Sequence, residues 1–178
     1  ILAETLRYQD ILNFNKEIYL IKNKNEIIIL GDYSININKK MEDCVEYLLN
    51  INKFKVICKP HPLNDFSKKL YKKYKIIKSS EKISDLSKKF NNFIVPNTST
   101  VGLELYLMGK NVITVLDNNL INYSPLKNYY NYQNYLYDLN QIEQKIYNDS
   151  ENQSYLDFFK KNNFFKEWKN IINNDWLT

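Results

Sequence analysis

Arginine, histidine, cysteine and glycine are all scarce in this sequence of 178 residues. Arginine occurs once, at Arg7, so the formal net charge of +5 at pH 7 is carried by lysines spread along the chain. Nucleic-acid-binding surfaces favour a basic stripe rich in arginine with interleaved aromatic residues, whereas the aromatic residues here cluster at 129–137 and 158–168. We therefore expect no nucleic acid as a partner and favour an anionic small molecule.

The two cysteines, Cys44 and Cys58, lack the paired spacing of a zinc site or a disulfide framework, and we expect both to be buried, reduced thiols. No Gly-x-Gly-x-x-Gly segment occurs, which argues against NAD or FAD. A Walker lysine loop, a His-Glu-x-x-His motif, a Cys-His-Asp nucleophile set and an Asp-x-Asp pair are also missing. We therefore expect no cofactor and no metal.

No apolar run reaches the roughly 20 residues of a membrane-spanning helix, and the N-terminus lacks the basic-then-apolar pattern of a secretory signal. These absences predict a soluble, cytoplasmic protein. The first residue is Ile1 rather than Met, and an amphipathic helix is predicted from the start, at 1–15. We therefore expect the chain to be a piece of a longer protein.

What the sequence does contain is a regular alternation of short apolar segments with segments of helical periodicity. Strands are predicted at 26–30, 55–58, 75–77, 93–95, 112–116 and 135–137. Helices are predicted at 38–50, 65–74, 83–90, 99–108, 141–147 and 155–172, with Asn38 as one N-cap and Gly109 as one C-cap. This alternation predicts an α/β fold, with a doubly wound, mainly parallel sheet, helices on both faces and a C-terminal helical extension.

The predicted elements divide the chain into three parts. Residues 26–150 are expected to form the Rossmann-like domain. Residues 1–25 are interpreted as a helical lead-in from a preceding N-terminal domain, and residues 151–178 as a helix that packs back towards that domain. The segment at 118–134 is rich in Asn and Tyr and too aromatic for a flexible spacer, which is typical of a binding loop.

Small and polar residues follow nearly every predicted strand. In an open parallel sheet, ligands bind outside the carboxyl ends of the strands, at the place where the strand order reverses. The residues at those ends are Gly31, Asp32, Tyr33 and Ser34, then Lys59, His61 and Pro62, then Ser79 and Ser80, then Asn97, Thr98, Ser99 and Thr100, and finally Ser124. We therefore predict a ligand site along this edge of the sheet.

The segment from Asn97 to Thr100 supplies hydroxyl groups at the expected start of a helix, where backbone N–H groups lack intrahelical partners. A phosphate group fits such a place. Plain N-capping is the alternative interpretation, since Ser and Thr are preferred caps in any case. Glu104, one turn further on, is within reach of ribose hydroxyls or is a solvated helix carboxylate.

His61 is the only histidine, and it stands between Pro60 and Pro62 at a strand end, after Lys59. Proline on both sides stiffens the backbone, so the direction of the imidazole ring is set. An imidazole in that position can donate a hydrogen bond to a phosphate or ribose oxygen. A lone histidine is more often structural than catalytic, but we favour a functional role because of this position.

Two short motifs, His61-Pro62 and Ser99-Thr100, occur in this order, each at a strand end. Together with the segments 3–8, 31–34 and 123–126, they resemble the C-terminal, donor-binding half of bacterial GT-B glycosyltransferases. The resemblance is closest to surface carbohydrate biosynthesis proteins related to Kdo transferases, and it extends to CMP-sugar transferases for sialic acid or Kdo. In several of these families, the His-Pro and Ser/Thr pairs bind the CMP moiety.

The resemblance implies a nucleotide-sugar donor, a CMP-sugar above all, and bacterial capsule or lipopolysaccharide biosynthesis. It implies that His61 contacts the donor phosphate during catalysis, without a metal. The glycan or glycolipid acceptor and the general base would belong to the preceding N-terminal domain, so this half alone is expected to be inactive. A full-length enzyme of this kind is compatible with peripheral association at the cytoplasmic face of the inner membrane.

Three other interpretations stay open. A CDP-glycerol or CDP-ribitol polymer transferase resembles the same scaffold and differs in its donor. A nucleotide-sugar epimerase of GT-B shape fits less well, because an acidic catalytic set is not evident. A non-catalytic interaction module would make His61 structural and would use the Tyr-rich loop to bind protein or glycan.

Overall fold

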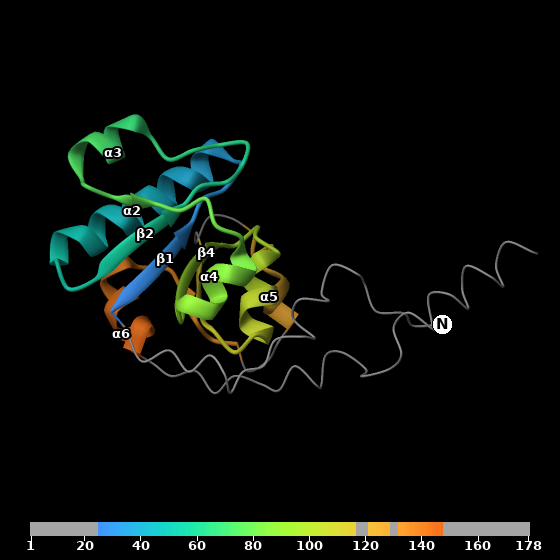
Figure 1. Ribbon diagram of the computed structural model, residues 1–178. Helices are drawn as coiled ribbons and strands as arrows, with labels where there is room; N and C mark the ends of the chain where they lie inside the picture. Colours follow the sequence, from blue (N-terminus) through green and yellow to red (C-terminus); the bar gives the residue numbers. More distant parts are fainter. Residues whose placement is uncertain (1–24, 117–120, 129–131, 148–178) are drawn as a thin grey trace, which may run out of the picture.

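A computed structural model describes residues 25–116, 121–128 and 132–147 of the chain (Figure 1). These residues form a six-stranded sheet in the order β3-β2-β1-β4-β5-β6, in which every neighbouring pair is parallel. The strands are β1 Glu26–Leu30, β2 Lys55–Lys59, β3 Ile77–Lys78, β4 Asn92–Pro96, β5 Asn111–Val115 and β6 Tyr135–Leu136. This is a doubly wound α/β fold of the Rossmann type, which confirms the predicted fold class.

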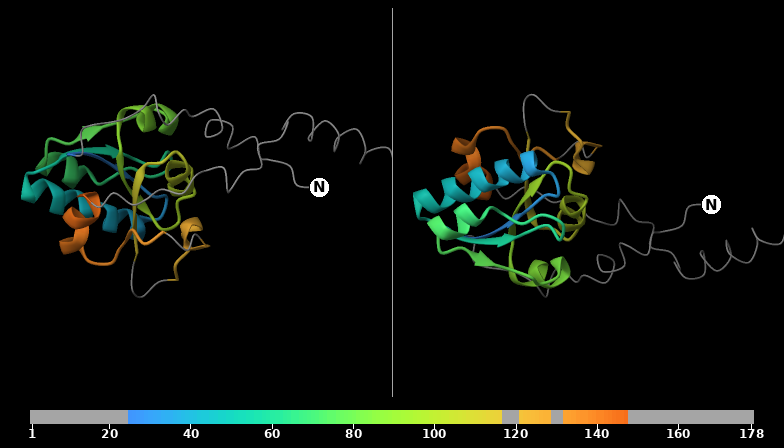
Figure 2. Two further views of the ribbon diagram at one scale, coloured as in Figure 1. Left: turned by 90° about the horizontal axis from the view of Figure 1, so that it is seen from below. Right: turned by 90° about the horizontal axis from the view of Figure 1, so that it is seen from above.

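Helices cover both faces of the sheet (Figure 2). One face packs on α2 Ile35–Ile51, α3 Lys68–Lys73 and α6 Ile142–Tyr147, and the other on α4 Ile83–Lys89 and α5 Val101–Leu107. Successive residues of β1 alternate between the two cores, because side chains along a strand point to opposite faces. Ile27 and Ile29 pack towards α2, whereas Ile28 and Leu30 pack towards α5. An apolar strand buried on both faces is what a covered parallel sheet requires.

The first helix after β1 begins earlier than the sequence predicts. It starts at Ile35, with Ser34 in the N-cap position, so the prediction of Asn38 as N-cap is wrong. Asn38 lies inside the helix on its buried face, at 4% exposure, in line with Met41 and Val45. Its side chain makes tertiary hydrogen bonds instead, with the Asp32 N–H and the Asp65 carbonyl of neighbouring loops.

Helix α5 differs from its prediction at one end and agrees at the other. It begins at Val101 rather than at Ser99, because the Ser99 N–H donates to the Pro96 carbonyl (3.0 Å) in a turn that precedes the helix. At its end, Gly109 has a φ of 74° and donates to Tyr106 O (2.9 Å), while Lys110 N–H donates to Leu105 O (3.0 Å). These two bonds form a Schellman motif, which confirms the C-cap role predicted for Gly109.

Both cysteines are buried and free, as predicted. Cys44 lies in α2 and Cys58 in β2, and both side chains belong to the core on the α2 face. Burial raises the pKa of each thiol to about 12. Each thiol is therefore protonated near neutral pH.

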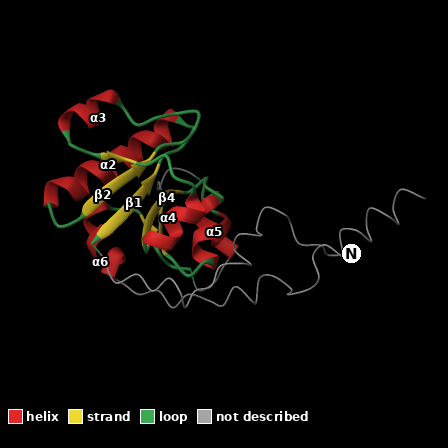
Figure 3. Cartoon of the chain, viewed as in Figure 1, coloured by secondary structure: helices red, strands yellow, loops and turns green. Residues whose placement is uncertain are grey.

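Buried asparagines hold α6 against the amino edge of the sheet, the edge opposite the carboxyl ends of the strands. Asn111 donates to Asn92 Oδ1 (2.9 Å) and to the Ile146 carbonyl (3.0 Å). The Tyr147 hydroxyl donates to Asn25 Oδ1 (3.3 Å), so the described chain enters and leaves this domain at neighbouring points. The alternation of strands and helices between these points is visible in Figure 3.

Several predictions fall outside the described residues. These are the helical lead-in before residue 25, the terminal helix at 155–172 and parts of the Asn- and Tyr-rich loop. Within the described part of that loop, Pro125–Asn128 forms the short 3-10 helix η3. No helix among the described residues has both the length and the apolar character needed to cross a membrane.

Candidate functional site at the carboxyl edge of the sheet

The strand order reverses between β1 and β4, the two central strands. After β1 the chain turns to α2 on one face of the sheet, and after β4 it turns to α5 on the opposite face. Loops that diverge in this way leave a crevice outside the carboxyl ends of the two strands, where ligands of doubly wound folds bind. The polar residues predicted after these strands, Asp32 and Thr98 among them, therefore flank the switch point.

Asp32 connects the two central loops. One carboxylate oxygen accepts the hydroxyl proton of Thr98 (2.5 Å) and the other accepts the Ser34 N–H (2.7 Å). The residue is only 3% exposed, and within the described part of the chain no cation pairs with it. Both carboxylate oxygens of this buried side chain are satisfied by hydrogen bonds from the two loops, so Asp32 and Thr98 organise the rim from beneath it.

Two asparagines attach the loop after β2 to the loop after β1. Asn38 Oδ1 accepts the Asp32 N–H (3.1 Å), and its amide donates to the Asp65 carbonyl (3.0 Å). Asn64 donates to the Asp32 carbonyl (3.0 Å). Because these bonds cross between loops, they preorganise the rim before any ligand arrives.

Gly31 lies where the two loops come closest. A Cβ atom at this position would stand 3.0 Å from the backbone nitrogen of His61 and 3.0 Å from Asn38 Oδ1. The backbone at Gly31 therefore approaches the His61 loop closely. A larger residue here would push that loop away from the switch point.

The His61 ring is held in a defined orientation. Its Nδ1 accepts the Leu63 N–H (3.2 Å), and its carbonyl accepts the Asn64 N–H (3.1 Å). With Nδ1 acting as an acceptor, the neutral ring carries its proton on Nε2, which is then a hydrogen-bond donor. The Tyr33 ring, 62% exposed, lies 6.1 Å from the His61 ring, centroid to centroid.

A pocket of about 410 Å³ opens between the loops that follow β2 and β3. Its polar and charged lining includes Lys59, His61, Asp65, Lys78, Ser79 and Ser80. Lys78 pairs with Asp65 (2.5 Å), whereas Lys59 has no ion-pair partner within the described part of the chain. The Lys59 ammonium is therefore available to an anion that enters the pocket.

Asp65 is the acidic member of this lining. Burial would raise the pKa of its carboxyl, but hydrogen bonds from Lys78, Tyr71 and the Phe66 N–H together hold it below its ordinary value. The carboxylate is thus ionised near neutral pH and engaged with Lys78. Its charge is neutralised locally, and the pocket keeps a positive balance through Lys59.

The turn from β4 to α5 carries the remaining hydroxyl residues. Asn97 is buried and donates to the Ile121 carbonyl (3.3 Å), which fixes the turn against the loop after β5. The Ser99 side chain is half-buried, and its hydroxyl has no hydrogen bond within the described part of the chain. Thr100 occupies the N-cap position of α5, and Glu104 lies one turn further with a half-buried side chain.

Ser124, the last of the predicted site residues, lies beneath the surface. It is 2% exposed, and its Oγ accepts the Leu126 N–H (3.2 Å) at the start of η3. This side chain therefore has a local role in capping η3. Pro62, by contrast, is exposed in the turn that follows His61.

Two residues of the rim, Asn38 and Asn64, escaped the sequence-based selection. Asn38 was assigned a capping role, although a polar residue in line with Met41 and Val45 on an apolar helix face signals a buried hydrogen-bonding role. Asn64 offers a weaker signal, an amide in a turn after two prolines. Its partner, the Asp32 carbonyl, is 32 residues away in sequence.

The chain has no significant match among protein-family models, curated proteins or solved structures. Among the described residues, no group of three or more His, Cys, Asp or Glu side chains is arranged to hold a metal ion. The class that fold and geometry define is a Rossmann-type α/β domain with a polar site at its carboxyl edge.

Proposed function

We propose that this chain is the nucleotide-sugar donor-binding domain of a glycosyltransferase, and that its donor is a CMP-sugar. The observation that carries the proposal is the junction of three loops at the carboxyl edge. The Asp32, His61 and Ser99 loops are joined there by hydrogen bonds, directly at the β1–β4 switch point and through Asn64. In doubly wound folds, this is the place where nucleotides bind.

The donor groups at this rim suit a phosphate. Lys59 contributes a charge with no ion-pair partner in the described residues, His61 contributes an Nε2–H donor, and Ser99 contributes a hydroxyl. Hydrogen bonds to ionised oxygens are roughly twice as strong as neutral ones. Because no Gly-x-Gly-x-x-Gly loop is present, side chains take the place of the backbone cradle used by dinucleotide sites.

The dimensions also favour a mononucleotide. Small-molecule pockets typically span about 300–1,000 Å³, and the pocket beside His61 measures about 410 Å³. The exposed Tyr33 ring next to His61 offers an aromatic surface for a base. One nucleoside phosphate with a sugar extending towards the crevice is compatible with this space.

The chemistry follows from where charge develops. When the bond from the sugar to the donor phosphate breaks, negative charge grows on the departing nucleotide oxygen. Lys59, the His61 Nε2–H and the Ser99 hydroxyl would stabilise that charge electrostatically, and their preorganised loops would lower the reorganisation cost. The order of His61-Pro62 and Ser99-Thr100 supports transfer of a sugar in surface polysaccharide biosynthesis, with the acceptor held by another domain.

Calorimetric titration of the chain with CMP, CDP and UDP tests the proposal. We expect saturable binding of CMP that is tighter than that of UDP. The double variant His61→Ala/Ser99→Ala should weaken CMP binding by at least 30-fold, since one hydrogen bond to a charged oxygen contributes about 2 kcal/mol. Preferred binding of CDP would point instead to a CDP-alditol donor.

A matched control is Gln144→Ala, which removes an exposed polar side chain from α6 at the opposite edge of the sheet. This variant should bind CMP as the unmodified chain does. If none of the three nucleotides binds, or if the double variant binds CMP unchanged, the donor-site proposal is wrong.

A further inference from the structure

The segment 65–78, which contains α3, is rich in positive charge. Between residues 65 and 78 the sequence contains six lysines and a single acidic residue, Asp65. The same stretch contains no arginine. Helix α3 itself reads Lys-Lys-Leu-Tyr-Lys-Lys, so most of its surface is cationic.

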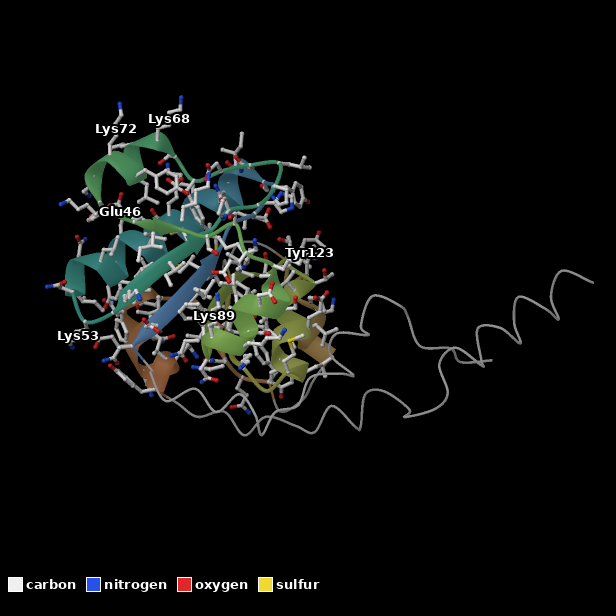
Figure 4. All side chains as sticks on the ribbon, in the orientation of Figure 1. Glu46, Lys53, Lys68, Lys72, Lys89 and Tyr123 are labelled. Carbon is white, nitrogen blue, oxygen red and sulfur yellow. The ribbon has the colours of Figure 1, made fainter. Side chains whose placement is uncertain are left out.

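The helix is anchored on one side only, which fixes the direction of its lysines. Leu70, at 1% exposure, packs into the core, and the Tyr71 hydroxyl donates to Asp65 (2.8 Å). Lys68 and Lys72 project away from the sheet, whereas Glu46 lies on the α2 side of α3 (Figure 4). The apolar contacts therefore hold the lysine face outward.

The carboxylates that lie against this segment are already engaged on its inner side. Glu46 pairs with Lys73 (2.9 Å), Asp65 pairs with Lys78, and Glu42 accepts the Ser67 hydroxyl (2.9 Å). Four exposed lysines of this segment have no ion pair within the described part of the chain; they are Lys68, Lys69, Lys72 and Lys75. The segment thus carries uncompensated charge.

An exposed apolar side chain lies just before this segment of the chain, in the loop between β2 and α3. Leu63 is 86% exposed in the loop that leads into α3. The turn that presents it is braced by the His61–Asn64 bridge and preceded by Pro62, so the side chain is held in water by a stiff backbone. Exposed cationic side chains and an exposed apolar one on the same stretch of chain are a combination that favours binding to the surface of an anionic membrane.

Aromatic side chains on this segment are not free to stack on nucleic-acid bases. The Lys73 ammonium lies over the Tyr74 ring, 4.8 Å from its centroid, and the Lys78 ammonium lies 5.9 Å from the Tyr71 ring centroid. Both tyrosine hydroxyls are engaged, with Asp65 and Asn50. Single-stranded nucleic-acid sites need accessible aromatic faces, so a lipid surface fits better than RNA or DNA.

We infer that the exposed lysines Lys68, Lys69 and Lys72 of α3 and Lys75 just after it dock together with Leu63 onto an anionic phospholipid bilayer. Docking in this way would hold the domain at the membrane through electrostatic attraction and shallow insertion of one apolar side chain. Leu63 also lines the pocket beside His61, so this pocket would open close to the lipid headgroups. The inference does not depend on nucleotide binding.

Co-sedimentation with vesicles tests this inference. The full chain should bind phosphatidylcholine vesicles that contain roughly one-third phosphatidylglycerol, should bind pure phosphatidylcholine far less, and should be released by high salt. One lysine near an anionic bilayer contributes about a fivefold change in partitioning. Lys68→Gln/Lys69→Gln/Lys72→Gln should therefore lose about a hundredfold, and Leu63→Ser should lose several-fold.

The matched control is Lys39→Gln/Lys82→Gln/Lys127→Gln, which removes the same charge from three exposed lysines on other elements. It should keep most of the vesicle binding. This result would show that binding depends on the lysines at 68–75 rather than on the net charge of the chain. Equal binding to neutral and anionic vesicles, no binding to either, or an equal loss in both triple variants would overturn the inference. So would stronger binding of the unmodified chain to a single-stranded oligonucleotide than to anionic vesicles.

Discussion

At the scale of single residues, Asp32 is a buried carboxylate whose hydrogen bonds come from two different loops. Thr98 belongs to the β4–α5 turn and Ser34 to the start of α2, so both loops converge on one side chain. Removing an acceptor of this kind is costly, because the Thr98 hydroxyl and the Ser34 N–H, both partly buried, lose this hydrogen bond.

We expect Asp32→Ala to lower the free energy of unfolding by about 2–3 kcal/mol, since it leaves the Thr98 hydroxyl and the Ser34 N–H without their acceptor. Urea denaturation followed by circular dichroism measures the change. Asp85→Ala, which removes a half-exposed carboxylate from α4, should change stability by no more than about 0.5 kcal/mol. Similar effects for the two variants would show that Asp32 does not organise the rim.

The pKa of Asp65 supplies a second test at this scale. Because its carboxyl pKa is lowered in the folded chain, it contributes stability above the ordinary pKa of an aspartate, and this contribution disappears as pH falls through the folded value. In Lys78→Met, the Asp65 pKa should rise, because the hydrogen bond from Lys78 is gone. Carbon-detected NMR titration of the Asp65 carboxyl measures both values; an unchanged pKa would contradict the role given to Lys78.

At the scale of elements, the ends of α5 depend on backbone geometry more than on side-chain chemistry. Gly109 has a φ of 74°, and its place in the Schellman motif needs a residue that accepts the left-handed region. The turn that precedes the helix is held by the Ser99 N–H and the Pro96 carbonyl.

We predict that Gly109→Ala lowers the free energy of unfolding by about 1 kcal/mol, because alanine is strained at positive φ. Gly109→Asn should cost less, since asparagine tolerates the left-handed region better than alanine does. Thermal unfolding of the two variants ranks them. An alanine variant as stable as the asparagine variant would contradict the left-handed conformation and the Schellman motif assigned to Gly109.

Much of the element order was predictable, because apolar runs that end at Gly or Pro are local signals. The strand at 26–30 agrees with β1 residue for residue, and Gly109 ends α5 as expected. Helix starts were harder to predict: Asn38 has the chemistry of an N-cap but is used for a tertiary contact with Asp32. The all-parallel order of six strands depends on pairings between distant segments, which no local pattern specifies.

That the loops of the candidate site meet at one edge of the sheet was predictable from the sequence, whereas the bonds between them were not. The rule that ligands bind at the carboxyl ends of parallel strands selected the Asp32, His61 and Ser99 loops from sequence alone. The bonds that join the loops, such as Asn64 to the Asp32 carbonyl, arise from packing and could not be predicted from spacing. Ser124 was selected from the sequence as a site residue, but in the structure its hydroxyl accepts the Leu126 N–H at the start of η3.

At the scale of the whole molecule, the only two thiols of the chain report on opening of the core. Burial raises the pKa of the Cys44 and Cys58 thiols to about 12, so the folded chain holds them protonated. The unfolded chain loses these protons at lower pH, so the thiols make folding less favourable as pH rises above their ordinary pKa.

In the native chain, we expect neither cysteine to react with Ellman's reagent over minutes at neutral pH, and both to react at once in denaturant. The labelling rate should track the rate of core opening, because the thiolate forms only after exposure. Rapid modification of one thiol under native conditions would contradict the packing of the α2 face.

The central claim, that the carboxyl edge binds a nucleotide phosphate through His61, has a direct spectroscopic test. Because His61 is the only histidine, its imidazole nitrogens give unambiguous signals in long-range ¹H–¹⁵N correlation spectra. Without nucleotide, the spectrum of the neutral ring should report its proton on Nε2, since Nδ1 accepts the Leu63 N–H. Addition of CMP should then shift the Nε2 resonance saturably and leave Nδ1 nearly unchanged. An imidazole spectrum that does not respond to CMP at millimolar concentration would contradict the account.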